Sequence, residues 1–204
     1  MNAPEPQWLA RRLNHYYRDR VRDTWGGVHI LRGRIPQSSD ICLMSNDYLA
    51  LSKEPSILEA QARTLLEQGI GMLMSGSFLL NGSSPHRDFE MRLARFMHAE
   101  DGVLCQSGYA ANTGLLQCIA DEQTPVYLDV LAHMSLWQGV RSAGAKAISF
   151  YHNDADHLQR QVLKYGPGVI VVDSVYSTNG SVCPLRDIVA VGSALGCILV
   201  VDES

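Results

Sequence analysis

The second half of the chain alternates short apolar runs with longer segments in which apolar residues recur at helical spacing. The apolar runs predict strands at 103–105, 126–128, 147–150, 169–172 and 197–201. The helical spacing predicts helices at 86–99, 109–120, 133–142, 155–164 and 184–194. Strands that alternate with helices of about ten residues are typical of a parallel sheet with helices on both faces. The run Val169–Val172 contains no polar residue, as expected for a strand covered on both sides. The predicted class is therefore α/β, with a mainly parallel sheet.

The first half of the chain has a less regular pattern. It predicts a surface helix or N-terminal arm at 7–22, a short apolar piece at 41–44, a helix at 55–68 and a loop at 69–84. The loop sequence G-I-G-M-L-M-S-G-S-F-L-L-N-G-S-S is too rich in Gly and Ser for a regular element. Loops of this length are often functional, so we expect residues 69–84 to lie near a site.

Composition narrows the functional classes. The chain has 204 residues, is 46% hydrophobic, carries a formal net charge of −4 and contains no basic run. These values are ordinary for a soluble globular protein and disfavour nucleic acid and anionic membranes as partners. The N-terminus M-N-A-P-E-P-Q-W-L-A lacks the features of a signal peptide, and no apolar run reaches the roughly 20 residues that span a bilayer. Cys105 and Cys197 lie in or beside apolar runs, so we expect reduced core cysteines in a cytoplasmic protein.

Polar residues follow the predicted strands at their carboxyl ends, where parallel sheets bind ligands. The candidates are Gln106, Ser107, Gly108 and Tyr109 after strand 103–105, Asp129 and His133 after strand 126–128, Asp173 and Ser177 after strand 169–172, and Asp202 after the last strand. We therefore expect the strand ends to converge on one edge of the sheet and to form the site.

The segment Q-S-G-Y-A-A-N-T-G joins a strand end to a helix start. Free backbone N–H groups at Ser107, Gly108 and Tyr109, together with the positive end of the helix dipole, would suit a phosphate. A Ser-Gly turn that only caps the helix explains the same residues about equally well. No G-x-G-x-x-G follows a strand and no G-x-x-x-x-G-K-[ST] occurs, so the sequence carries no fingerprint of an NAD site or a P-loop.

Asp202 ends an apolar strand, where an unpaired carboxylate is costly. It is either an acid that supports its neighbours or caps a helix, or a carboxylate that faces a cation. The protonated pyridine nitrogen of pyridoxal phosphate is such a cation, and the charged nitrogen makes this cofactor an electron sink. His133 could then stack on the ring, although a histidine at a helix start is often only structural. Ser177 could bond the phenolic oxygen of the ring, or be a turn serine in S-T-N-G.

The segment H-N-D-A-D-H at 152–157 contains the residue types of a metal site. It lies between strand 147–150 and helix 155–164, where Asn153 or Asp154 would cap the helix. We therefore interpret it as a helix start and predict no metal ligands.

Five motifs carry a family resemblance. They are N-D-Y-L-A-L (46–51), S-G-Y-A-A-N (107–112), D-V-L-A-H-M-S (129–135), D-S-V-Y-S-T-N-G (173–180) and V-V-D-E-S (200–204). In this order they resemble the α-oxoamine synthases, pyridoxal-phosphate enzymes of the aspartate-aminotransferase fold (fold type I) that join an amino acid to an acyl-CoA. F-L-L-N at 78–81, A-H-M-S-L-W-Q-G and G-P-G-V-I-V-V-D-S-V-Y-S-T look most like the α-hydroxyketone quorum-sensing autoinducer synthases.

The resemblance implies a role for each matching residue. Ser107, Gly108 and Tyr109 would contact the cofactor phosphate. His133 would stack over the pyridine ring and help to position the substrate, while Ser177 would bond the ring oxygen and Asp202 the pyridinium nitrogen. Asn46 would lie near the amino-acid carboxylate. Asp173 is also expected to be one of the cofactor-binding residues. The segment H-R-D-F-E at 86–90 is interpreted as structural.

Two parts of the family pattern are absent from the sequence. The family continues the last motif into a histidine and later into the lysine that holds the cofactor as a Schiff base. The lysines here, Lys53, Lys146 and Lys164, lie in other contexts. We therefore expect the front of a longer protein, with an N-terminal helix or arm at 1–45 and the N-terminal part of the large cofactor-binding domain at 46–204. The rest of that domain and the small C-terminal domain would be missing.

The leading hypothesis is a pyridoxal-phosphate-dependent acyl-CoA:amino-acid C-acyltransferase that makes an α-aminoketone signal precursor. It would be a cytoplasmic homodimer when full length, and the 204-residue piece would be inactive alone. A second hypothesis is a catalytically silent partner subunit, although the retention of His133, Ser177 and Asp202 argues against it. A third is another fold type I enzyme such as an aminotransferase, which the N-D-Y-L and A-H-M-S motifs disfavour.

Overall fold

The computed structural model describes residues 6–23, 37, 39, 41, 45–68 and 85–204. The chain forms two compact units, residues 1–74 and 75–204. The predicted loop at 69–84, with its F-L-L-N stretch, and most of the apolar piece at 41–44 lie outside the described residues. Among the described residues, no helix is both long and apolar enough to cross a membrane.

The described residues of the first unit form four helical elements. They are α1 (Gln7–Asn14), the π-helix η1 (His15–Arg22), the 3₁₀-helix η2 (Leu51–Lys53) and α3 (Pro55–Gln68). The predicted helices at 7–22 and 55–68 are therefore confirmed. Asp47 fixes the start of η2, because its carboxylate accepts hydrogen bonds from the backbone N–H groups of Leu51 at 2.8 Å and Ser52 at 3.1 Å.

The described part of the second unit begins with α5 (Pro85–Phe96), whose polar side chains bind the segment that follows it. Arg87 pairs with Glu90 at 3.2 Å and with Asp101 at 2.8 Å. Glu90 also accepts a hydrogen bond from the backbone N–H of Leu104 at 2.9 Å. These contacts agree with the structural interpretation of H-R-D-F-E.

The predicted strand at 103–105 is wrong. Residues 101–105 form no ladder with any described residue, and the Leu104 N–H that a neighbouring strand would need is bound to Glu90. Val103 is 79% exposed and Cys105 is exposed as well, so the prediction of a core cysteine also fails at Cys105. An apolar run becomes a strand only where another strand offers its backbone groups. Cys197, in contrast, packs against the core as predicted.

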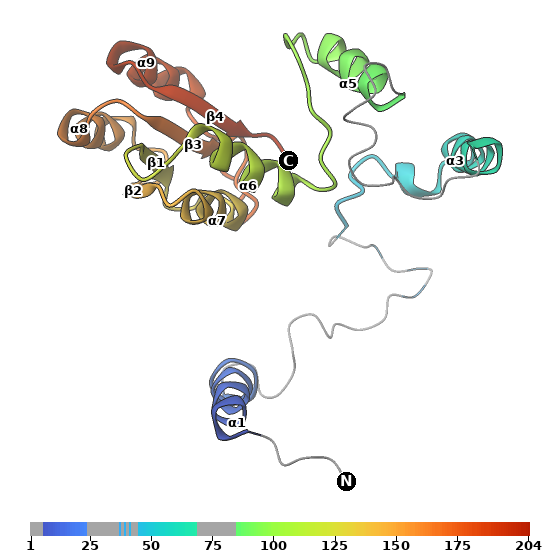
Figure 1. The fold of residues 1–204 in the computed structure, drawn as a ribbon, viewed down its shortest axis with the longest axis horizontal. Helices are drawn as coiled ribbons and strands as arrows, with labels where there is room; N and C mark the ends of the chain where they lie inside the picture. Colours follow the sequence, from blue (N-terminus) through green and yellow to red (C-terminus); the bar gives the residue numbers. More distant parts are fainter. Residues whose placement is uncertain (1–5, 24–36, 38, 40, 42–44, 69–84) are drawn as a thin grey trace. The chain divides into compact units, whose positions relative to one another are not determined.

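The rest of the second unit is a four-stranded parallel sheet with helices on both faces (Figure 1). Its elements are α6 (Gly108–Ile119), β1 (Pro125–Asp129), α7 (Met134–Ser142), β2 (Lys146–Phe150), α8 (Ala155–Tyr165), β3 (Val169–Asp173), α9 (Leu185–Leu195) and β4 (Ile198–Asp202). The strand order is β2-β1-β3-β4. The chain leaves β1 toward β2 and then crosses to β3 on the other side, so the order reverses between β1 and β3. The predicted α/β class is confirmed.

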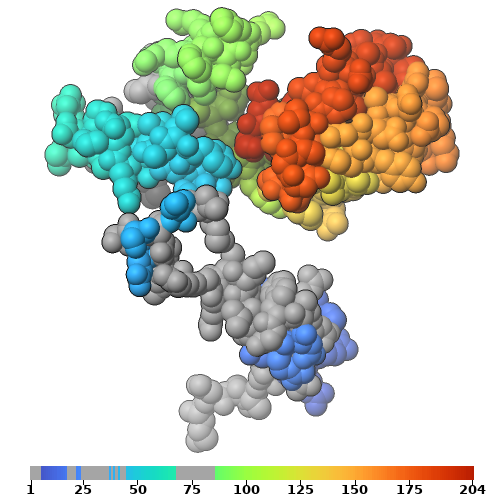
Figure 2. All heavy atoms as spheres, turned by 180° about the vertical axis from the view of Figure 1, so that it is seen from behind, coloured from blue at the N-terminus to red at the C-terminus, as the bar shows by residue number. Residues whose placement is uncertain are grey.

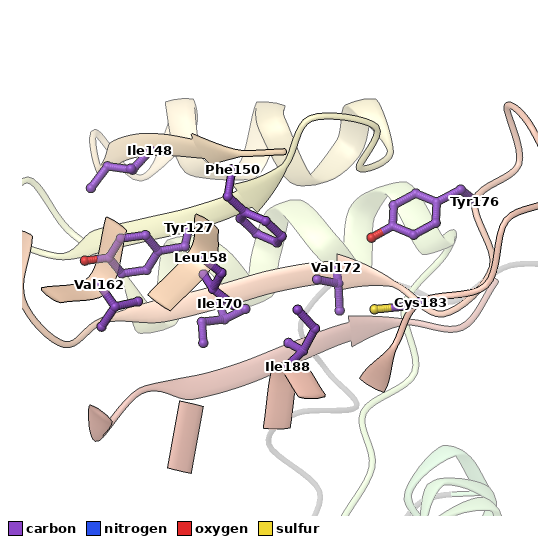
Figure 3. Packing of buried hydrophobic residues seen from close by; sticks show 10 residues of the cluster. All are labelled: Tyr127, Ile148, Phe150, Leu158, Val162, Ile170, Val172, Tyr176, Cys183 and Ile188. Atoms are coloured by element: carbon purple, nitrogen blue, oxygen red, sulfur yellow. The ribbon is translucent and has the colours of Figure 1, made fainter. Parts of the chain in front are cut away.

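Each face of the sheet has its own apolar layer. Tyr127, Phe150, Ile170 and Val172 point toward α8 and α9, and Figure 3 shows this cluster together with Leu158, Val162 and Ile188. The alternate residues Val126, Leu128, Val169 and Val171 pack with Leu116, Leu136 and Val140 of α6 and α7. In the space-filling view the yellow-to-red atoms of these elements gather into one body (Figure 2). Each fully buried side chain of this size contributes about 1.5–3 kcal/mol to stability.

The same alternation decides to which face of the sheet each carboxylate at a strand end points. Asp129 follows Tyr127 by two residues and therefore points to the α8/α9 face. Asp173 and Asp202 follow Val171 and Val200, so both point to the α6/α7 face. The carboxyl ends of β1, β3 and β4 therefore meet at one edge of the sheet as predicted, but the side chain of Asp129 points to the opposite face from those of Asp173 and Asp202.

Asp129 organises the cluster on the α8/α9 face. Its buried carboxylate accepts hydrogen bonds from the backbone N–H groups of Leu131 at 2.8 Å and Asn153 at 2.9 Å. It also lies 2.9 Å from Nδ1 of His152, whose Nε2 is 2.7 Å from the hydroxyl of Ser181. This chain of contacts ties the end of β1 to the loop after β3.

Several polar groups of H-N-D-A-D-H make structural contacts of this kind. Asp154 caps α8, because it accepts a hydrogen bond from the backbone N–H of His157 at 2.7 Å. His157 in turn accepts one from the backbone N–H of Tyr151 at 2.9 Å. The predicted helix cap is confirmed, and within the described part of the chain no group of acidic, His or Cys residues is arranged to hold a metal ion.

We predict that Asp129→Asn destabilises the protein by about 1–3 kcal/mol, because an amide nitrogen in place of one carboxylate oxygen leaves a buried donor unpaired. Urea unfolding followed by circular dichroism measures the change. Glu122→Gln, at an exposed carboxylate in the loop before β1, is the matched control and should leave stability unchanged. Equal stabilities of the two variants would contradict this role of Asp129.

We also predict that Gly168→Ala destabilises the protein by about 1–3 kcal/mol. A Cβ atom at Gly168 would lie 2.0 Å from the carbonyl oxygen of Pro125 on the neighbouring strand, so β1 and β3 would have to separate. Gly114→Ala in α6 is the control, because a Cβ atom there meets no atom of a described residue within 4 Å and alanine favours a helix. The thermal midpoint should fall for Gly168→Ala only, and a fall of equal size in both variants would refute the packing argument.

Candidate cofactor site

The start of α6 provides unpaired backbone donors. Ser107 has an extended backbone and caps the helix, since its hydroxyl accepts a hydrogen bond from the backbone N–H of Ala110 at 3.1 Å. No described residue accepts a hydrogen bond from the backbone N–H of Gly108 or Tyr109. The first N–H groups of a helix lack intrahelical acceptors, so they remain able to bind an anion. The capping role of Ser107 and an anion site at the helix start are therefore compatible.

Gly108 faces the end of β4. Among the described residues, a Cβ atom built on Gly108 would have only the hydroxyl of Ser204 within 4 Å, at 3.9 Å. Tyr109, the next residue, is 49% exposed. The helix start therefore lies beside the strand end that carries Asp202, with open space at the glycine.

Asp202 is the most extensively hydrogen-bonded carboxylate of this cluster. Its Oδ2 accepts a hydrogen bond from Asn112 Nδ2 at 2.7 Å. Its Oδ1 accepts two from Ser204, from the backbone N–H at 3.0 Å and from the hydroxyl at 2.6 Å. Partial burial raises the pKa of Asp202, but the bonds from Ser204 and Asn112 and the nearby His133 ring lower it more, so that the pKa lies below its ordinary value. Asp202 is therefore held as a carboxylate.

Asp173 lies beside Asp202 in a different environment. The two residues are direct partners in the parallel pairing of β3 and β4. Asp173 is 5% exposed and accepts the backbone N–H of His133, at 3.1 and 3.2 Å to its two oxygens. Burial raises the pKa of Asp173, the bond from His133 offsets this only in part, and the charge of Asp202 raises the pKa further. The two neighbouring carboxyls therefore have pKa values shifted in opposite directions.

His133 is exposed and has a fixed orientation. It caps α7, and its Nδ1 accepts a hydrogen bond from the backbone N–H of Ser135 at 3.3 Å. The hydroxyl of Ser135 is 2.7 Å from the same nitrogen. Asp173 holds the His133 backbone, so the end of β3 positions the start of α7. The ring is therefore held at its Nδ1 edge, while the residue as a whole remains exposed to solvent.

Asn112 joins Asp202 to the His133 side of the cluster. Its amide nitrogen lies 2.7 Å from Asp202 and 2.9 Å from the hydroxyl of Ser135, which is fully buried. Sequence analysis did not select Asn112 or Ser135, although both end quoted motifs, S-G-Y-A-A-N and D-V-L-A-H-M-S. The helical spacing gave a signal, since Asn112 lies four residues after Gly108 and so on the same face of α6.

The structure does not test the predicted roles of two further residues. Ser177 is exposed in the turn after β3, and no hydrogen bond joins it to another described residue. Asn46 is exposed and belongs to the first unit. Their predicted contacts with a cofactor and a substrate remain predictions.

Comparison with known proteins finds similar curated proteins and similar solved structures. The chain is 44% identical over 201 residues to the CAI-1 autoinducer synthase of Vibrio campbellii, covering 98% of this chain and 51% of that protein. It is 36% identical to the 8-amino-7-oxononanoate synthase of Mycolicibacterium smegmatis, covering 85% of this chain and 46% of that protein. Among solved structures, serine palmitoyltransferase from S. paucimobilis matches with a TM-score of 0.70 and 28% identity over 77% of this chain and 40% of that one.

These relatives confirm the resemblance to the α-oxoamine synthases that the five motifs predicted. The chain spans about half the length of the curated relatives that it matches. The family model for aminotransferase class I and II matches residues 38–204. The chain therefore belongs to the aminotransferase class I and II family.

Proposed function

We propose that the full-length protein is a pyridoxal-phosphate-dependent acyl-CoA:amino-acid C-acyltransferase of the α-oxoamine synthase type. The observation that carries this proposal is the Asp202 carboxylate, held ionised at the end of β4 next to the exposed ring of His133 and the start of α6. Similarity to an autoinducer synthase favours an α-aminoketone or α-hydroxyketone signal as the product.

The residues of the cluster fit pyridoxal phosphate by their chemistry. Asp202 would hold the proton on the ring nitrogen, since its Oδ2 accepts one hydrogen bond from the described residues and can accept another. The N–H groups of Gly108 and Tyr109, with Ser107 at the helix start, would bind the phosphate. The exposed His133 ring would lie against the pyridine ring. When bound, the cofactor supplies an electron sink for a carbanion at the amino-acid Cα.

The remaining roles follow from the family resemblance and from the names of the relatives. Ser177 would bond the phenolic oxygen of the cofactor, and Asn46 would lie near the substrate carboxylate. Asp173 would act through His133, whose backbone it holds. The substrates would be an acyl-CoA and an amino acid, and the assembly a homodimer in the cytoplasm.

The lysines of the chain have other partners or positions. Lys146 and Lys164 lie 4.3 and 4.9 Å from the ring centre of Tyr165, and Lys53 ends η2 in the first unit. We infer that none of them binds the cofactor as a Schiff base and that the 204-residue chain alone is inactive. A silent partner subunit is less well supported, because such a subunit has no use for an ionised Asp202 beside an open histidine ring.

We predict that Asp202→Ala in the full-length protein lowers kcat by about 10²-fold or more, because the ring nitrogen loses the charge that keeps it protonated. Steady-state kinetics with an acyl-CoA and a panel of amino acids, and the visible absorbance of the bound cofactor, measure the effect. Glu122→Ala, at an exposed acid of the same unit, is the control. An Asp202→Ala variant with the parent rate and the parent spectrum would overturn the proposal.

For His133 we predict that replacement by Ala weakens pyridoxal phosphate binding by about 2- to 10-fold, the range expected for one aromatic contact. His133→Phe should bind the cofactor more tightly than His133→Ala, because it keeps a flat ring. Titration of the full-length apoprotein with the cofactor, followed by tryptophan fluorescence, gives both dissociation constants. Equal constants for the Ala and Phe variants would show that the ring does not stack.

A further inference from the structure

Four side chains form a continuous hydrogen-bond chain across the α6/α7 face. Asn112 Nδ2 lies 2.7 Å from Asp202 Oδ2 and 2.9 Å from Ser135 Oγ. Ser135 Oγ lies 2.7 Å from His133 Nδ1. The chain thus connects the strand end of β4 to the ring at the start of α7 through a residue of α6.

The donor and acceptor of each hydrogen bond follow from the groups that can only donate or only accept. The Asp202 carboxylate only accepts, so the Asn112 atom that faces it must be the NH₂ group. The second N–H of this group points to Ser135 Oγ, which therefore accepts. The proton of Ser135 is then left for Nδ1 of His133, 2.7 Å away.

A second, longer contact favours the same state of His133. The backbone N–H of Ser135 can only donate, and it donates to His133 Nδ1. A nitrogen that accepts a hydrogen bond carries no proton, so the proton of the neutral ring must lie on Nε2. Both donors of Ser135 therefore favour the same tautomer, but the hydroxyl at 2.7 Å is the closer contact and the backbone N–H at 3.3 Å the weaker one, so loss of the hydroxyl should let the other tautomer appear.

We propose that Asn112 and Ser135 are positioning residues that form a hydrogen-bond chain from Asp202 to His133 and hold its imidazole as the tautomer with the proton on Nε2. The chain couples the two groups that would contact the cofactor, and this functional consequence rests on the proposed function. A change at Asp202 or Asn112 would therefore alter the tautomer of a ring that neither residue touches.

The direct test is NMR of the full-length apoprotein with ¹⁵N-labelled histidine, with the His133 signals assigned from a His133→Gln variant. The parent protein should show neutral His133 with the proton on Nε2 alone. Ser135→Ala and Asn112→Leu should instead give a mixture of both tautomers. Ser135→Thr, which keeps the hydroxyl, should restore the single tautomer.

The matched control is Thr113→Val. Thr113 neighbours Asn112, but its hydroxyl bonds only backbone oxygens of α6, at Tyr109 and Ala110, so the His133 signals should not change. A proton on Nδ1 of His133 in the parent protein would overturn the proposal whatever the variants show. Unchanged tautomers in folded Ser135→Ala and Asn112→Leu would overturn it as well.

Cofactor affinity separates this inference from the proposed function. Asn112→Leu should weaken pyridoxal phosphate binding about tenfold or more, because a hydrogen bond to a charged group is lost. Its effect and that of Ser135→Ala should be non-additive in the double variant, and additive effects would contradict the chain. A parent protein with the predicted tautomer that binds no pyridoxal phosphate would refute the proposed function and leave the hydrogen-bond chain standing.

Discussion

The parallel pairing of β3 with β4 places two carboxyl groups side by side, and the site depends on how the fold accommodates them. Asp173 and Asp202 are register partners, so their side chains leave the sheet on the same face. Two adjacent carboxylates repel, and the fold gives them different neighbours. Asp202 receives hydrogen bonds from Asn112 and Ser204, which favour its charge, whereas Asp173 is almost fully buried against the backbone of His133. The hydrogen bonds thereby stabilise the negative charge of Asp202 at the end of β4.

The helices around these two carboxyl groups each contribute groups to the site. α6 supplies free N–H groups at its start and Asn112 one turn later, while α7 supplies His133 and Ser135. The opposite face uses Asp129 and His152 to hold the loop after β3. The change of strand order between β1 and β3, where parallel sheets bind ligands, lies between these two clusters.

The parts of the fold that the sequence predicted are those set by local patterns. Val169–Val172 is apolar throughout because both sides of β3 are covered, and the helices that follow each strand show their own spacing. The prediction of a strand at 103–105 failed because a strand needs a neighbouring strand to pair with, and the composition of the run does not show whether one is present. Asp202 and His133 could be selected from their places at strand ends. The spacing of Asn112 from Gly108 placed it on the same face of α6, but neither Asn112 nor Ser135 could be assigned a role, because the sequence does not show which side chains they meet in the fold.

The central claim is that Asp202 keeps a proton on the ring nitrogen of pyridoxal phosphate. ¹⁵N NMR of the full-length protein loaded with cofactor labelled at that nitrogen tests it most directly. The account predicts the chemical shift of a protonated pyridinium nitrogen across the neutral pH range, and its loss when Asp202 is replaced by Ala. A neutral pyridine nitrogen in the parent protein, or a pyridinium signal that persists without Asp202, would contradict the account.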